Sequence, residues 1–134
     1  MESRIFYQKV QEKAELSDPL SARRATKSVL ETLHWRLPEG EANDIEATLP
    51  PELQKVWRGN WGMIIAKKLG RVDKYDKNQF LAQVRTKLRL ETNEQAEKTT
   101  VAVIHVLKEA IPIGESEDML AQLPGDLAHL IKAA

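Results

Sequence analysis

The chain has 134 residues, a length that suits one compact domain with a hydrophobic core of its own. Its 20 basic residues balance its 20 acidic residues, and this neutrality argues against broad electrostatic capture of nucleic acid or of an anionic membrane. There is no Cys, which excludes a disulfide, a thiol nucleophile and a Cys-type zinc site.

The first half of the sequence predicts four helices separated by residues that stop helices. Asp18 can cap the second helix, and Pro19 fits its first position, where no backbone N–H is needed. Pro38 is expected to end that helix, and Gly40 is expected to let the chain reverse in a left-handed conformation. The predicted helices cover residues 4–16, 19–37, 41–48 and 51–57.

Residues 58–75 form a spacer of different composition. Two Gly and an Asn at positions 59–62 favour a turn or a helix end. Four apolar residues then predict a short buried helix that ends at Gly70: Met63, Ile64, Ile65 and Leu69. The spacer is also the most basic region of the chain, so a solvated helix face is its expected surface.

The second half predicts four more helices with clearer boundaries. Capping boxes begin two of them, one from Asp76 to Gln79 and one from Thr92 to Gln95. Pro112 is placed like Pro38, and a short helix with Met119 and Leu123 follows it. The last helix covers residues 124–132. Because no stretch shows sustained period-2 alternation, the predicted fold is all-α.

The two halves repeat one sequence at an offset of 74 residues. Residues 6–57 and 80–131 align without a gap and share 16 identities, among them Phe6 with Phe80. The prediction is therefore a helical bundle built from two tandem four-helix repeats, about 4–57 and 76–132, joined by the helical spacer. Each repeat alone is marginal in size, so the two are expected to share one core in a single domain, residues 1–134.

A recurring motif makes the repeat resemble a known family. Gly-Glu, Asp and Ala-x-Leu-Pro recur in GEANDIEATLPPEL at 40–53 and in GESEDMLAQLPGDL at 114–127. Together with GNW at 59–61 and DKNQFLAQV at 76–84, they resemble the bacterial family of domain of unknown function 2267 over most of the chain. The resemblance implies a two-repeat helical bundle and brings no catalytic residues with it. The spacer departs from the family in being rich in Lys and apolar residues.

Two pairs of carboxylates stand at the start of predicted helices. Glu41 with Asp44, and Glu115 with Asp118, are spaced i and i+3, a spacing that can meet a metal ion or form an acid–base pair. Helix capping is the favoured interpretation, because acidic groups in a first turn offset the positive end of the helix dipole. The oxygen-ligand string of a calcium loop is absent from the sequence.

No enzyme or cofactor signature is found elsewhere. Glu31 and His34 match the Glu-x-x-His pattern of di-iron bundles, but the second repeat has His105 and Lys108 at those positions, so half of such a site is missing. Because charged residues replace all three histidines in the other repeat, His34, His105 and His129 are expected at the surface. Nucleophile-elbow and glycine-rich phosphate motifs are absent, so neither a catalytic residue, a metal nor a cofactor is expected.

Three tryptophans and the basic spacer supply the candidate interaction surface. Trp35 falls opposite the apolar stripe of its helix, where it either packs under a loop or contacts another chain. Trp57 and Trp61 are expected at the seam between the repeats, with an exposed partner-binding patch as the alternative. The residues of this surface are Trp35, Trp57, Trp61, Lys67, Lys68 and Arg71.

The function expected from these observations is that of a non-enzymatic helical interaction module that binds a protein partner or itself. A weak nucleic-acid or acidic-surface binder, acting through the basic spacer, is the second hypothesis, and an enzyme with no recognisable motif is the third. The apolar runs, such as residues 63–66, are too short to span a bilayer, and the N-terminus is charged where a signal peptide is apolar. A cytoplasmic protein without a membrane partner is expected.

Overall fold

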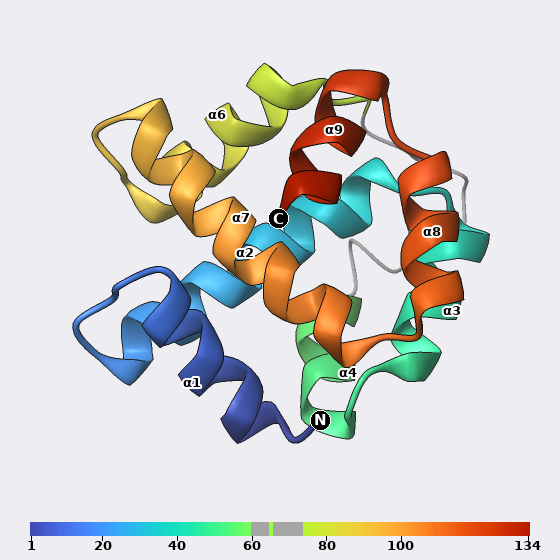
Figure 1. Ribbon diagram of the computed structural model, residues 1–134, viewed down its shortest axis with the longest axis horizontal. Coiled ribbons are helices and arrows are strands. Elements are labelled where there is room, and N and C mark those ends of the chain that lie inside the picture. Colours follow the sequence, from blue (N-terminus) through green and yellow to red (C-terminus); the bar gives the residue numbers. More distant parts are fainter. Residues whose placement is uncertain (60–64, 66–73) are drawn as a thin grey trace.

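A computed structural model gives the fold and describes residues 1–59, 65 and 74–134. Within these residues the structure is all-α, with helices joined by short connections and with no strand (Figure 1). The helices are α1 (Ser3–Lys13), α2 (Pro19–Arg36), α3 (Glu39–Thr48), α4 (Pro51–Arg58), α6 (Lys77–Leu88), α7 (Asn93–Ala110), α8 (Ile113–Ala121) and α9 (Gly125–Ala133). None of these helices is both long enough and apolar enough to cross a membrane.

The predicted capping residues begin the helices as expected. The Asp18 carboxylate accepts a hydrogen bond of 2.7 Å from the Ser21 backbone N–H, and Pro19 is the first residue of α2. Both predicted capping boxes are present, at Asp76 for α6 and at Thr92 for α7. Side-chain acceptors of this kind satisfy backbone N–H groups that have no partner within the helix, which fixes where each helix begins.

The predicted left-handed conformation of Gly40 is wrong, and the same holds for its counterpart Gly114. Both glycines lie in the first turn of a helix, α3 and α8 respectively, and neither has a positive φ. Pro38 and Pro112 are N-caps of these helices, so the chain changes direction at the prolines and the glycines follow as ordinary helical residues. Gly59, the C-cap of α4, has the positive φ instead, at 73°.

The helix contacts between the two repeats are symmetric. Helices α2 and α7, which correspond at the offset of 74 residues, cross at the centre of the molecule, and α3 packs beside its counterpart α8 (Figure 1). Helix α1 of the first repeat packs on α7 of the second, and α6 of the second packs on α2 of the first. Swapping the first repeat for the second turns each of these contacts into another one of the set or into itself. This is the pattern of an approximate two-fold axis.

One hydrophobic cluster contains residues of both repeats. Phe6 and Val10 of α1 are fully buried in it, as are their counterparts Phe80 and Val84 of α6. The spacer prediction is wrong where it can be compared: Ile65 is helical but 55% exposed, whereas it was expected in the core. Trp61 and the rest of the predicted spacer helix, including Met63 and Ile64, lie outside the described residues.

Candidate functional site

A cationic cleft lies where α6 packs on α2. Its volume is about 530 Å³, and four basic side chains line it against one carboxylate, a formal excess of three positive charges. The lining residues are Arg24, Lys27, Ser28 and Glu31 of α2 with Lys87, Leu88 and Arg89 at the end of α6. This cleft concentrates positive charge on a chain whose formal net charge is zero.

One of the four cations is held in place and three are not. Lys87 Nζ donates a hydrogen bond of 2.9 Å to Thr32 Oγ1 and lies 3.5 Å from the Glu31 carboxylate. Among the described residues, the side chains of Arg24, Lys27 and Arg89 have no carboxylate or hydrogen-bond partner. Their positive charge is therefore available to a ligand.

Ser28 adds a neutral hydrogen-bond donor to the cleft. The residue is 5% exposed, and its Oγ is buried without a hydrogen-bond partner in the described part of the chain. A buried hydroxyl with no partner costs on the order of 1–3 kcal/mol, so a ligand oxygen that accepts from it would recover that energy. The hydroxyl and the three unpaired cations line the same cleft.

The equivalent α1–α7 interface provides an internal comparison. At the positions of Arg24 and Arg89 it carries Lys98 and Glu15, which form an ion pair of 3.0 Å on the face where α1 packs on α7. Glu15 and Arg89 even share the left-handed backbone conformation, with φ of 55° and 54°. Where one of the two equivalent interfaces carries a carboxylate and a cation that neutralise each other, the other interface carries two cations.

Two further cleft positions differ in the same direction. Lys27 corresponds to Val101, and Ser28 corresponds to Ala102, so an alkyl group stands where the cleft has a cation or a hydroxyl. Glu109 on the α1–α7 face is also paired, since its carboxylate lies 2.7 Å from Lys9 Nζ and 3.0 Å from His105 Nε2. The excess of positive charge therefore belongs to one of two equivalent interfaces and is not a property of the fold.

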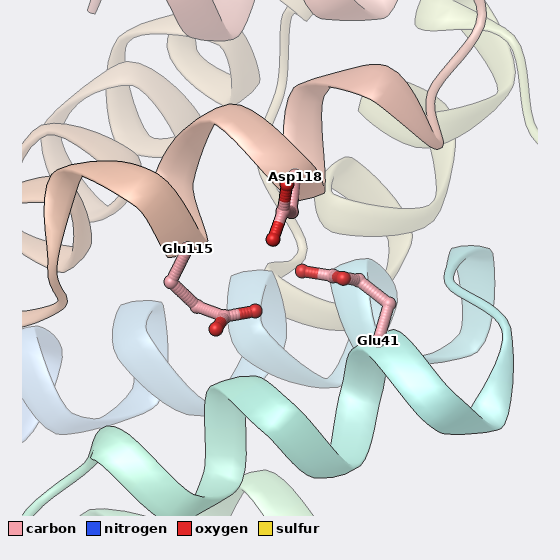
Figure 2. Close-up of side chains that lie close together, drawn as sticks. All are labelled: Glu41, Glu115 and Asp118. Carbon is pink, nitrogen blue, oxygen red and sulfur yellow. The ribbon is translucent and has the colours of Figure 1, made fainter.

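A carboxylate cluster lies on the contact between α3 and α8. Figure 2 shows Glu41 of α3 pointing toward Glu115 and Asp118 of α8, and one oxygen from each lies within 4.8 Å of the others. Oε1 of Glu41 and Oε1 of Glu115 are buried without a hydrogen-bond partner within the residues described. Glu41 and Glu115 occupy equivalent positions in the two repeats, so the approximate two-fold axis brings like charges together.

The cluster holds a proton near neutral pH. Burial raises the pKa of Glu41 to about 7, with further contributions from a hydrogen bond to the Glu115 carboxyl and from the charges of Glu115, Asp118 and Asp44. Three carboxylate oxygens also suit a hard divalent cation, which usually takes six or more oxygen ligands. Either a proton or a cation would relieve the repulsion between these groups.

Comparison with protein families identifies the chain. The sequence profile described as "Uncharacterized conserved protein (DUF2267)" matches residues 3–130, nearly the whole length. The chain belongs to the DUF2267 family. Comparison with curated proteins gives no match.

The structure removes Trp57 from the candidate interaction surface of this DUF2267 protein. Trp57 is fully buried, its Nε1–H donates a 2.9 Å hydrogen bond to the Ala42 carbonyl, and its ring stacks on His34 at 4.8 Å. The alternative of an exposed patch is therefore wrong for Trp57. Within the described residues, the hydrogen bonds and the ring stacking of Trp57 involve His34 and Ala42 of the first repeat.

The three histidines have different environments. His34 is 7% exposed, so its predicted surface position is wrong; His129 is exposed as predicted, and His105 is partly exposed. The Nδ1 of His34 lies 2.5 Å from the Trp57 carbonyl oxygen. Because a carbonyl oxygen only accepts hydrogen bonds, Nδ1 carries the proton.

The other predicted surface residues are only partly described. Trp35 is half-buried on α2, while Trp61, Lys67, Lys68 and Arg71 lie outside the described residues. Sequence reasoning missed the α2–α6 cleft of the DUF2267 chain, although the alignment of the repeats contained the signal. Comparing charge at positions related by 74 residues shows that Arg89 corresponds to Glu15 and Lys27 to Val101. What the sequence did not provide was that these positions meet across α2 and α6.

Proposed function

We propose that this protein is a non-enzymatic helical interaction module that binds an acidic segment of a protein partner in the α2–α6 cleft. The single observation that supports it is the set of unpaired cations in the cleft, at positions where the equivalent interface has an ion pair. Charge complementarity of this kind steers association and selects partners. The bacterial, cytoplasmic setting expected from the sequence is part of this proposal.

The size of the cleft favours a peptide segment over a nucleic acid. A volume of about 530 Å³ with an excess of three charges matches a short stretch of acidic side chains. Nucleic-acid binding usually neutralises many phosphates along a basic surface, whereas this chain has no net charge. Nucleic acid therefore remains an outcome of the test and is not the proposal.

Binding of a labelled hexaglutamate peptide tests the proposed function. In low salt, fluorescence anisotropy should show saturable binding to the full chain, and the Kd should rise as salt is added. The variant Lys27→Val/Arg89→Glu carries the residues of the other repeat, and we expect it to weaken binding about tenfold or more, the loss of about 1.4 kcal/mol or more. Because both positions are exposed, the variant should fold normally.

Two controls make this experiment decisive. Lys98→Ala removes a cation from the α1–α7 face, where it is paired with Glu15, and should leave hexaglutamate binding unchanged. Equal binding by wild type and by Lys27→Val/Arg89→Glu would refute the cleft as the binding surface. Tighter binding of a single-stranded oligonucleotide than of hexaglutamate, lost in the same variant, would replace the protein partner with nucleic acid.

A further inference from the structure

The composition of the α2–α6 cleft restricts the kind of anion it suits. Two guanidinium groups and two ammonium groups face one carboxylate, and a buried hydroxyl stands beside them. A carboxylate ligand carries one negative charge, which leaves two of the three excess positive charges uncompensated. A phosphoryl group carries about −1.5 to −2 charges at neutral pH and three strong acceptor oxygens, so it compensates more of the excess charge than one carboxylate and offers an acceptor to each of the three unpaired cations.

The donors of the cleft differ in kind as a phosphoryl site requires. Arg24 and Arg89 offer planar guanidinium groups, which bind phosphate oxygens in pairs, and Lys27 offers a compact charge. Ser28 lines the cleft, and its buried hydroxyl has no partner among the described residues, so it is left to donate to a ligand. Lys87 is oriented from α6 by Thr32, so the site includes one cation that is already in position.

Folding does not require the cations and the hydroxyl of the α2–α6 cleft, because the equivalent interface lacks them. The equivalent α1–α7 interface is built from the corresponding helices with Glu15, Val101 and Ala102 in place of Arg89, Lys27 and Ser28, so the fold needs neither the cations nor the hydroxyl. Gathered without partners, these cations repel one another in the unbound protein. A bound dianion offsets that repulsion. A purely structural role does not explain why these three residues are gathered at one interface.

We infer that the α2–α6 cleft is a phosphoryl-binding site that receives a phosphorylated side chain of the protein partner. This inference rests on the proposed function, because it names the group that the acidic segment presents. Arg24, Arg89 and Lys27 bind the phosphoryl oxygens, and Ser28 donates its hydroxyl hydrogen to one of them. The phosphorylated residue stays intact, since binding alone is proposed.

Three blocked peptides test the inference with the full chain: Gly-Gly-phosphoserine-Gly-Gly, and the same peptide with Glu or Ser at the centre. Calorimetry should give the phosphoserine peptide at least about tenfold tighter binding than the Glu peptide, with no binding of the Ser peptide. Ser28→Ala should weaken the binding of the phosphoserine peptide several-fold and should change the affinity for the Glu peptide little. Thermal unfolding of each variant confirms that it is folded.

Transfer of the site to the other interface is the strongest form of the test. The variant Glu15→Arg/Val101→Lys/Ala102→Ser gives the α1–α7 face the cleft's residues and should bind a second phosphoserine peptide. If that variant does not fold, Glu15→Arg/Val101→Lys changes two residues that are not buried and should raise peptide affinity at the new face.

The outcomes separate this inference from the proposed function. Equal affinity for the phosphoserine and Glu peptides would overturn the phosphoryl site and leave the acidic partner in place. Binding of inorganic phosphate as tight as that of the phosphoserine peptide would overturn the assignment to a phosphorylated protein and point to a free anion. Failure of hexaglutamate and of all three peptides to bind would remove the proposed function itself.

Discussion

At the scale of single residues, the two motif glycines are ordinary helical positions. Gly40 is the second residue of α3, its φ is not positive, and a Cβ added to it would meet no atom within 4 Å. Gly40→Ala should therefore raise the free energy of unfolding by about 0.5 kcal/mol, because Ala loses less backbone entropy on folding. Urea denaturation of Gly40→Ala measures it, and Gly114→Ala should behave alike.

Gly59 supplies the matched control for that substitution. Its φ of 73° and ψ of −149° lie in a region that residues with a Cβ rarely adopt. Gly59→Ala should lower the stability by about 1 kcal/mol or more, opposite in sign to Gly40→Ala. A loss of stability in Gly40→Ala would contradict the helical assignment of that glycine.

Trp57 is the largest fully buried side chain among the described residues. It is fully buried, stacks on His34 and donates its indole N–H to the Ala42 carbonyl. Trp57→Ala should cost about 3–5 kcal/mol, because it leaves a cavity and removes the indole hydrogen bond and the stacking on His34. Trp57→Phe keeps most of the ring and should cost less. A melting temperature unchanged in Trp57→Ala would show that the ring does not contribute to the core.

The position of His34 shows what the repeat alignment could and could not predict. Its counterpart is Lys108, and a position that accepts Lys was taken to be exposed. In the structure Lys108 Nζ hydrogen-bonds the carbonyl oxygens of Ile131, Lys132 and Ala134 at the end of α9, and His34 reaches the end of α4 at Trp57. Both cap a helix C-terminus, a shared role that residue type alone does not reveal.

At the scale of elements, the contact between α3 and α8 should respond to pH. The pKa of Glu41 is raised to about 7 in the folded protein, above the ordinary value near 4.5 of the unfolded chain. Between these values the unfolded chain releases a proton that the folded protein keeps, so the free energy of unfolding falls as pH rises from about 5 to 8. Glu41→Gln should remove this slope and melt at a higher temperature than wild type at pH 8.

The pH experiment needs one control and has a clear contrary result. Measurements with EDTA keep divalent cations from replacing the proton at Glu41, Glu115 and Asp118. The window above pH 5 also avoids the ionisation of Asp18, whose pKa is lowered by hydrogen bonds from Ser21. If wild type and Glu41→Gln change equally in stability between pH 5 and 8, the shared proton does not couple to folding.

Most helices were predictable because local chemistry fixes them. Asp18, Asp76 and Thr92 cap their helices through bonds within four residues, and periodic apolar residues define the buried faces. The candidate site was not predictable in the same way. The α2–α6 cleft joins Lys27 to Arg89, and the carboxylate cluster joins Glu41 to Glu115, so both depend on how the repeats pack.

At the scale of the whole molecule, neither repeat should fold well alone. Phe6 of α1 and Phe80 of α6 are fully buried in one cluster, and each of these helices packs on a long helix of the other repeat. Residues 75–134 expressed alone should therefore be poorly folded or self-associated, because α7 loses α1 and α6 loses α2. A monomeric fragment with a sharp thermal transition of its own would contradict the shared core.

The reciprocal contacts of the two repeats have a consequence for chain connectivity. The spacer joins Arg58 at the end of α4 to Lys77 at the start of α6, and the approximate two-fold axis relates that gap to the one between Lys132 and Ser3. A circularly permuted chain, with residues 75–134 first, a copy of the spacer next and residues 1–59 last, should therefore build the same molecule. The circular dichroism and thermal unfolding of the permuted chain should match those of the native chain. The contacts between the repeats are equivalent whichever repeat comes first in the sequence.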